Sequence, residues 1–131
     1  MPDIEDPELR QKLAAVRRPT WIPEVVDGDG GPSDSKFSGS PCLPNGETWP
    51  ACGNCGRPLQ LFVQLNARDL PAEAQPLLDG GVLQLFYCAR EEPNCESECD
   101  AFFPNATSTL LRLLAPGEVA DVRTPAPPDD A

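Results

Sequence analysis

The cysteines constrain this chain more than any other feature, because two of its six form a C-x-x-C motif. Cys52 and Cys55 enclose Gly53 and Asn54, and Gly56 follows directly. Glycines let the backbone turn tightly enough for two thiolates to converge on one ion, while N–H groups of the turn point at the sulfurs. The motif is therefore typical of a zinc knuckle and would supply half of a tetrahedral site.

The other two ligands have to come from a later group, Cys88, Cys95 and Cys99. Residues 59–66 are predicted to form a strand directly after the motif, and residues 82–88 a second strand that ends at Cys88. If these strands pair antiparallel, the start of the first lies beside the end of the second. Both cysteine groups then meet at one end of the sheet. We expect Cys95 as the fourth ligand, because its shorter loop closes at lower entropy, with Cys99 as the alternative.

Four thiolates predict a structural zinc ion, since no coordination position remains for water. Disulfides in a secreted protein and a redox dithiol are the rival explanations of the cysteines. The redox reading is disfavoured because the glycine turn does not open a long helix within a βαβ pattern. An iron–sulfur cluster usually shows a different spacing of its cysteines.

Charge and composition exclude several functions. The 131 residues include 10 Lys and Arg against 21 Asp and Glu, a net charge of −11, which argues against binding a nucleic-acid backbone and suits a basic partner. The absence of histidine excludes histidine-based catalysis. No run of about 18 apolar residues predicts a membrane span, and the acidic N-terminus does not resemble a secretory signal. We therefore expect a cytoplasmic protein, in which cysteines are more often thiols or metal ligands than disulfides.

A short helix is predicted near the N-terminus. Asp6 can cap it and Pro7 suits its first position. Leu9, Leu13 and Val16 would share one face, which predicts that the helix docks on the rest of the chain.

The rest of the chain predicts a mostly β fold, a small α+β fold at the margin, built on an antiparallel sheet. The strand at 59–66 alternates apolar and polar side chains, whereas the strand at 82–88 is apolar on both faces apart from Gln84, so it should be central and buried. Residues 107–114 are a third strand candidate. Residues 35–50 are predicted to form an ordered irregular loop with three apolar anchors, Phe37, Leu43 and Trp49.

These patterns divide the chain into three parts. Residues 1–19 are the N-terminal helix and arm, and residues 20–114 are the zinc-stapled β domain. Residues 115–131 are predicted to be a flexible, acidic, Pro-rich tail, because the stretch is rich in Pro and Asp.

Several short motifs, taken in order, resemble a known family. They are Ser-Lys-Phe-Ser-Gly-Ser-Pro-Cys-Leu-Pro at 35–44, Trp-Pro at 49–50, Cys-Gly-Asn-Cys-Gly-Arg-Pro-Leu at 52–59, Gln-Leu-Asn at 64–66 and Gly-Val-Leu-Gln-Leu-Phe at 81–86. Together they resemble the YwqG-like bacterial family of unknown function, with Ser38 standing where a glycine is usual. The cysteine-bearing form is also similar to the N-terminal part of programmed cell death protein 2 and its yeast relative in ribosome maturation.

The resemblance implies a mostly antiparallel β fold, and it matches Cys52, Cys55, Cys88 and Cys95 to presumed zinc ligands. In the eukaryotic relatives the implied role is to chaperone a small-subunit ribosomal protein.

The function predicted from these observations is a non-catalytic, zinc-containing protein-binding module, with a chaperone-like binder of a basic client as its more specific form. Its binding surface should include the exposed side of residues 59–66 and the loop at 35–50. Two alternatives stay open: an enzyme of unknown chemistry that uses Cys42 or Cys99 as a nucleophile, and a structural zinc domain of a larger assembly.

Overall fold

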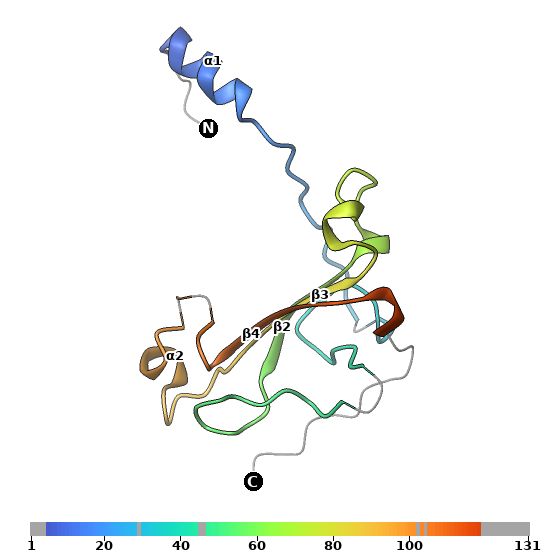
Figure 1. Cartoon of the computed structure of the whole chain (residues 1–131), viewed down its shortest axis with the longest axis vertical. Coiled ribbons are helices and arrows are strands. Elements are labelled where there is room, and N and C mark those ends of the chain that lie inside the picture. The colour runs from blue at the N-terminus through green and yellow to red at the C-terminus, as the bar shows by residue number, and fades with distance from the viewer. Residues whose placement is uncertain (1–4, 29, 45–46, 102, 104, 119–131) are drawn as a thin grey trace.

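The computed structural model describes residues 5–28, 30–44, 47–101, 103 and 105–118, and its core is a four-stranded antiparallel sheet in the order β1-β2-β3-β4 (Figure 1). The strands are β1 (Lys36–Phe37), β2 (Gln60–Asn66), β3 (Val82–Tyr87) and β4 (Thr109–Leu114). The helices are α1 (Pro7–Ala15) and α2 (Cys95–Glu98), with 3-10 turns η1 (Ala67–Asp69), η2 (Gln75–Leu78) and η3 (Pro116–Glu118). The mostly β fold and its antiparallel sheet are confirmed. Most of the predicted tail, residues 119–131, lies outside the described residues.

The three long strands form where the sequence predicted strands, and the first two pair antiparallel as supposed. β2 and β3 are antiparallel neighbours, joined through η1 and η2, and Gln60 lies opposite Tyr87. β3 pairs with β4 along its whole length, from Val82 opposite Leu114 to Tyr87 opposite Thr109. The strand at 82–87 is therefore central in the sheet.

A bulge in β2 changes which side chains point inward. The register against β3 shifts between Leu61 and Val63, so Gln64 and Asn66 lie on the same face as Leu61. The simple alternation expected along this strand is thus wrong, because one extra residue moves every later side chain to the opposite face. Gln64 is fully buried as a result.

The two faces of the sheet differ in their cover. The inner face carries Leu61, Val82, Phe86 and Leu114, all buried, and the irregular segments between residues 30 and 59 pack against it. We call the opposite face the outer face. Val63 and Leu65 from β2, Leu83 and Leu85 from β3, and Leu111 and Leu113 from β4 form it.

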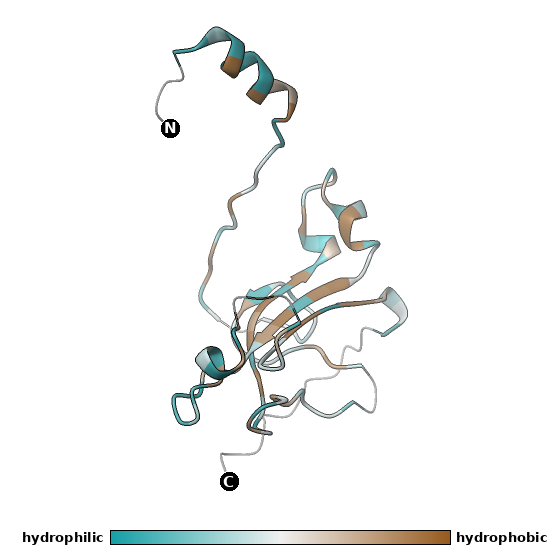
Figure 2. Cartoon of the chain, turned by 60° about the vertical axis from the view of Figure 1, so that its left-hand side comes forward, coloured by the Kyte–Doolittle hydropathy of each residue, from teal (hydrophilic) through white to brown (hydrophobic). Residues whose placement is uncertain are grey.

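The outer face is open to solvent. Leu111 is 66% exposed and Leu113 is 48% exposed, while Leu83 and Leu85 are only half-buried. The expectation that the second strand is buried on both sides is therefore wrong. Figure 2 shows the hydrophobic character of these strands.

Two buried glutamines fasten the loop before β2 to the inner face. The Gln64 carbonyl accepts hydrogen bonds from the Cys42 backbone N–H and from the Gln84 amide, both at 2.8 Å. The Gln64 amide donates to the carbonyls of Pro32 at 3.0 Å and Asp34 at 2.8 Å. The Gln84 amide also donates to the Cys42 carbonyl at 2.6 Å. These bonds replace the sheet-like pairing that the irregular loop cannot make.

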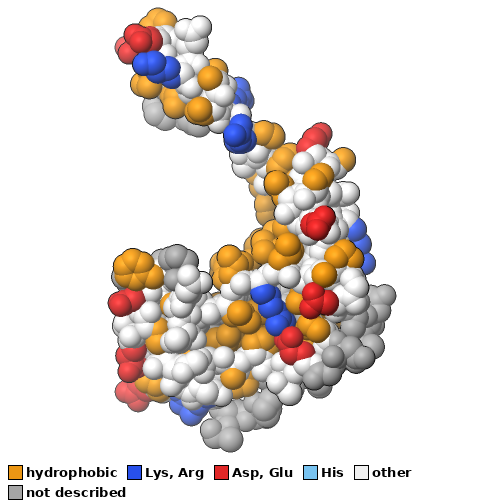
Figure 3. All heavy atoms as spheres, in the orientation of Figure 1, with side chains coloured by type: hydrophobic (Ala, Val, Ile, Leu, Met, Phe, Trp, Pro, Cys, Tyr) orange, Lys and Arg blue, Asp and Glu red, His pale blue; other side chains and the backbone are white. Residues whose placement is uncertain are grey.

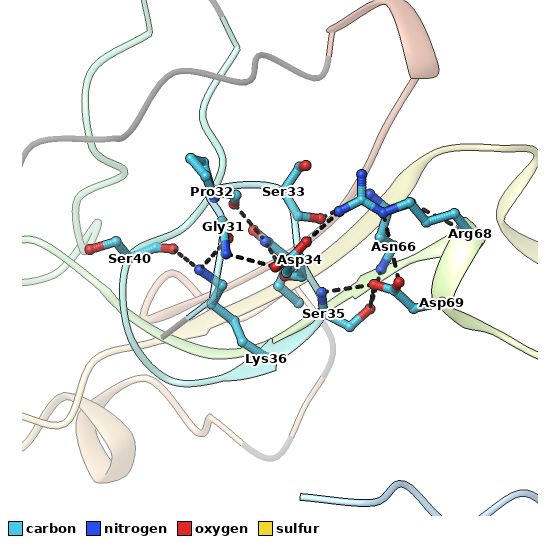
Figure 4. A network of polar contacts seen from close by, with 11 residues as sticks. Gly31, Pro32, Ser33, Asp34, Ser35, Lys36, Ser40, Asn66, Arg68 and Asp69 are labelled. Carbon is cyan, nitrogen blue, oxygen red and sulfur yellow. Dashed lines mark hydrogen bonds and ion pairs between the residues drawn. The ribbon is translucent and has the colours of Figure 1, made fainter. Parts of the chain in front are cut away.

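A second polar network orders the turn that leads into β1 (Figure 4). The Asn66 amide donates to the Ser33 carbonyl at 2.9 Å, and the Ser35 hydroxyl donates to the Asp69 carboxylate at 2.8 Å. The Asp34 carboxylate accepts from the Gly31 N–H at 2.6 Å, a bond that holds the pKa of Asp34 below its usual value. Within the described part of the predicted loop, Ser35 and Cys42 are thus held in place by hydrogen bonds to side chains of η1 and β2.

The loop is held less by its aromatic anchors than expected. Phe37 is 54% exposed, so it does not cover the core, whereas the Trp49 indole N–H donates to the Leu59 carbonyl at 2.7 Å. Ser38 adopts a φ of 63°, a left-handed conformation that glycine would adopt without strain.

Helix α1 forms where predicted but does not dock. The Asp6 carboxylate accepts from the Glu8 N–H at 2.9 Å, which confirms the cap. No residue of α1 is buried, and the helix stands away from the sheet (Figure 1).

Among the described residues, no helix is long and apolar enough to cross a bilayer.

Candidate metal centre

The first half of the centre is the tight turn from Cys52 to Arg57. The Gly56 N–H donates to the Cys52 carbonyl at 2.9 Å, and the Cys52 N–H donates to the Arg57 carbonyl at 2.7 Å. Gly56 has a φ of 77°, which only glycine adopts without strain. The Asn54 N–H lies 3.4 Å from the Cys52 sulfur, as a knuckle requires.

The second half comes from the end of β3 and from α2. Cys88 directly follows the strand, and its N–H donates to the Ser108 carbonyl at 2.9 Å. Cys95 is the first residue of α2, and the Asn94 side-chain Oδ1 caps that helix by accepting from the Ser97 N–H at 3.1 Å. The polar loop between Cys88 and Cys95 therefore bends back toward the sheet.

The segment before β4 ties the two halves together. The Thr107 carbonyl accepts from the Gly53 N–H at 2.9 Å, while the neighbouring Ser108 carbonyl binds Cys88. A methyl group on Gly53 would lie 3.0 Å from the Thr107 side chain, so the turn and this segment are in close contact. Nothing in the sequence indicated the part played by residues 107–108, because these are main-chain contacts.

Four sulfurs meet at this point. Cys52, Cys55, Cys88 and Cys95 place their sulfur atoms within 4.8 Å of one another, and Cys55 and Cys88 are 3.7 Å apart. Zn–S bonds of about 2.3 Å in a tetrahedron separate neighbouring sulfurs by about 3.8 Å. A separation of 3.7 Å is far too long for a disulfide, whose S–S bond is about 2.05 Å. The cluster can therefore hold a metal ion.

Burial makes the cluster a poor place for thiolates without a cation. Burial raises the pKa of the Cys88 thiol well above its ordinary range. The Asn54 amide donates to the Cys95 sulfur at 3.3 Å and lowers the pKa of that thiol, but burial and the sulfurs of Cys55 and Cys52 leave the pKa raised. The Arg57 backbone N–H lowers the pKa of Cys55. A bound cation reverses this balance, because it stabilises all four thiolates at once.

The remaining cysteines lie outside the cluster. Cys99, the alternative fourth ligand, accepts a hydrogen bond from the Thr107 hydroxyl at 3.2 Å and is not among the four gathered sulfurs. Cys42 is fully buried under the glutamine network, which disfavours it as a nucleophile. The structure thus brings together Cys52, Cys55, Cys88 and Cys95, the four cysteines that the sequence selected.

The fold and the cluster define a small antiparallel β domain with a candidate metal centre of four cysteine sulfurs at one end of its sheet. The chain belongs to the family described as Domain of unknown function (DUF1963), whose model matches residues 35–111, from β1 into β4. YwqG is a member of this family, so that part of the resemblance is confirmed. No curated protein matches the chain, and the similarity to programmed cell death protein 2 stays a prediction.

Proposed function

We propose that the four cysteines hold one structural Zn²⁺ ion and that the chain acts as a non-catalytic protein-binding module. The observation that carries the metal assignment is the gathering of four sulfurs within 4.8 Å at the end of the β2–β3 pair. A cage of four sulfurs suits zinc or an iron–sulfur cluster, and the glycine-containing knuckle favours zinc. With four thiolates bound, the ion keeps no open position for a reacting water, which supports a structural role.

The outer face supports the binding role. Its six apolar side chains are adjacent, with those of β4 exposed and those of β2 and β3 half-buried, and a contiguous apolar patch on a protein surface often marks a binding site. Acidic residues dominate the chain, so an apolar partner with basic flanks is the best match. A chaperone-like role toward a basic client is the specific form of this proposal, and it draws its support from the resemblance. The proposal takes residues 20–114 as the module and the reducing cytoplasm as its compartment, where thiols stay available to metal.

The metal assignment is tested by native mass spectrometry and elemental analysis of the full chain purified under reducing conditions with zinc. We expect one zinc ion per chain. Cys95→Ser should lose most of the zinc, while the matched variant Cys99→Ser should keep it, because only the first removes a clustered sulfur. A wild-type protein without metal, one that carries iron and absorbs visible light, or equal losses in the two variants would overturn the assignment.

A further inference from the structure

The outer face needs an occupant, and the chain itself carries a matching surface. Residues 5–28, which we call the N-terminal arm, contain α1 and an extended segment. On α1 the apolar stripe of Leu9, Leu13 and Val16 is 47%, 44% and 66% exposed. Figure 3 shows hydrophobic side chains exposed both on the arm and on the body of the molecule.

Helix α1 is too short to be stable without a packing surface. It has nine residues, and isolated helices shorter than about 12–15 residues are marginal in water. Its Asp6 cap and its exposed Glu8–Lys12 ion pair at 3.3 Å add only modest stabilisation. The helix therefore requires an apolar surface to pack against.

Helix α1 and the residues directly after it carry a charge opposite to that of the body. Residues 7–18 contain four basic side chains and one acidic side chain, a net charge of +3. Residues 30–118 contain five basic and eleven acidic side chains, a net charge of −6. Acidic side chains gather on the side of the body that carries α2 (Figure 3). The basic part of the arm, residues 7–18, is thus attracted to the body electrostatically as well as by apolar contact, whereas residues 5–28 as a whole carry a net charge of −1.

The dimensions of the two surfaces also agree. In a set of three neighbouring strands, the axes of the first and the third strand lie about 10 Å apart. This width matches the diameter of a helix, about 10 Å. The extended segment behind the helix adds further exposed apolar side chains, including Ile22 at 91% and Val25 at 74%. Helix and segment together can cover the outer face.

The segment that follows the arm in the chain lies on the inner face of the sheet, opposite to the outer face. The carbonyls of Pro32 and Ser33 accept hydrogen bonds from Gln64 and Asn66, whose side chains point to the inner face. To reach the outer face of its own sheet, the arm would have to turn around the β1 edge. The outer face of another molecule presents no such obstacle.

We propose that the outer face binds the N-terminal arm of a second copy of this chain, in a reciprocal exchange that closes a symmetric dimer. Arm exchange is a low-cost route to a two-fold dimer, because each copy gains a contact that it does not make within its own chain. The inference rests on the proposed function only in treating the outer face as a binding surface, and it does not depend on the metal ion.

Light scattering after size-exclusion chromatography tests the exchange on the full, zinc-loaded chain. The wild-type protein should elute with twice the 14.1 kDa mass of one chain. Leu13→Glu on the arm and Leu111→Glu on the outer face should each raise the dimer Kd at least about tenfold. The matched control Leu77→Glu alters an exposed leucine of η2, outside the arm and the sheet, and should leave the dimer intact.

Mixing the two variants distinguishes arm exchange from other dimers. Leu13→Glu keeps an intact face and Leu111→Glu keeps an intact arm, so an equimolar mixture should recover dimers that neither variant forms alone. A wild-type monomer at every concentration would overturn the proposal. So would a dimer that survives Leu13→Glu, since this result indicates direct packing of two sheets.

A fluorescent peptide of residues 5–28 separates this proposal from the broader one. A monomeric wild-type protein that does not bind this peptide, yet binds an unrelated basic amphipathic peptide in a way that Leu111→Glu abolishes, would overturn the dimer and leave the binding module intact. A protein that binds neither peptide would remove both.

Discussion

Replacing Gln64 by methionine tests whether the buried amide network holds the fold together. Methionine keeps the length and approximate volume of glutamine but removes all hydrogen bonding. Four hydrogen bonds would disappear, two that Gln64 accepts and two that it donates. The Cys42 N–H would lose its side-chain partner in the interior, as would the carbonyls of Pro32 and Asp34.

The expected loss follows from these contacts. Each buried group left without a partner costs about 1–3 kcal/mol, and burying the apolar methionine side chain returns about 1.5 kcal/mol or more. With three groups left without a partner, Gln64→Met should therefore lower the free energy of unfolding by about 1.5–7.5 kcal/mol, a large share of the roughly 5–15 kcal/mol typical of a domain. Gln60→Met, an exposed position on the same strand, should change it by less than about 0.5 kcal/mol.

Urea denaturation of the zinc-saturated proteins, followed by circular dichroism, measures the difference. Amide hydrogen exchange should show in addition that Cys42 loses protection, because its N–H donates to the Gln64 side chain. If Gln64→Met costs no more than Gln60→Met, the network does not stabilise the fold and the reasoning is refuted.

Three further predictions concern single residues. Asn54→Ala removes the amide that donates to a cluster sulfur and should weaken zinc binding about 10–100-fold, measured by competition with a chromophoric chelator; an unchanged affinity would count against its role. Gly81→Ala should lower the free energy of unfolding by about 3 kcal/mol or more, because its Cβ would lie 2.0 Å from a backbone carbonyl oxygen of β4. Gly56→Ala places its Cβ in open space and should lower it by only about 1 kcal/mol, because of the positive φ. Urea denaturation measures both values. The pKa of Asp34 is lowered from its usual value of 3.8, so the ionised carboxylate stabilises the folded state at pH values above 3.8. This stabilisation is lost as the pH falls through the lowered pKa. Asp34→Asn should therefore show a smaller loss of stability on acidification in urea titrations between pH 5 and 2, and identical pH profiles would contradict this.

The meeting of the four cysteines could be predicted because it depends on topology alone. Once residues 59–66 and 82–87 pair antiparallel, the C-x-x-C turn before one strand must lie beside the end of the other. The choice of Cys95 over Cys99 followed from loop closure, and the structure gathers Cys95 with the other three sulfurs. The support from Asn54 could also have been inferred, since a side chain inside such a turn is close to the sulfurs.

Which side chains of β2 point to the inner face could not be predicted in the same way. A bulge after Leu61 costs little locally, but it decides whether Val63 or Gln64 points to the core. Only the partners of Gln64, which lie about 20 and 30 residues away in the chain, make the polar choice favourable. Long-range satisfaction of buried polar groups therefore overrode the local hydrophobic pattern.

The exposed outer face and the metal centre have a common explanation. A sheet that turns one apolar face to solvent forgoes the burial that stabilises most domains, at about 25 cal/mol for each Å² left uncovered. The described chain makes up for this at the inner face with bonded amides and, at the end of the β2–β3 pair, with a sulfur cluster whose zinc would contribute to folding directly. A core held by a bound metal would leave the outer face free for binding, because the fold would not need to bury that face. Loss of the metal should then unfold the protein rather than merely loosen one loop, since the four sulfurs join the turn before β2 to the end of β3 and to α2.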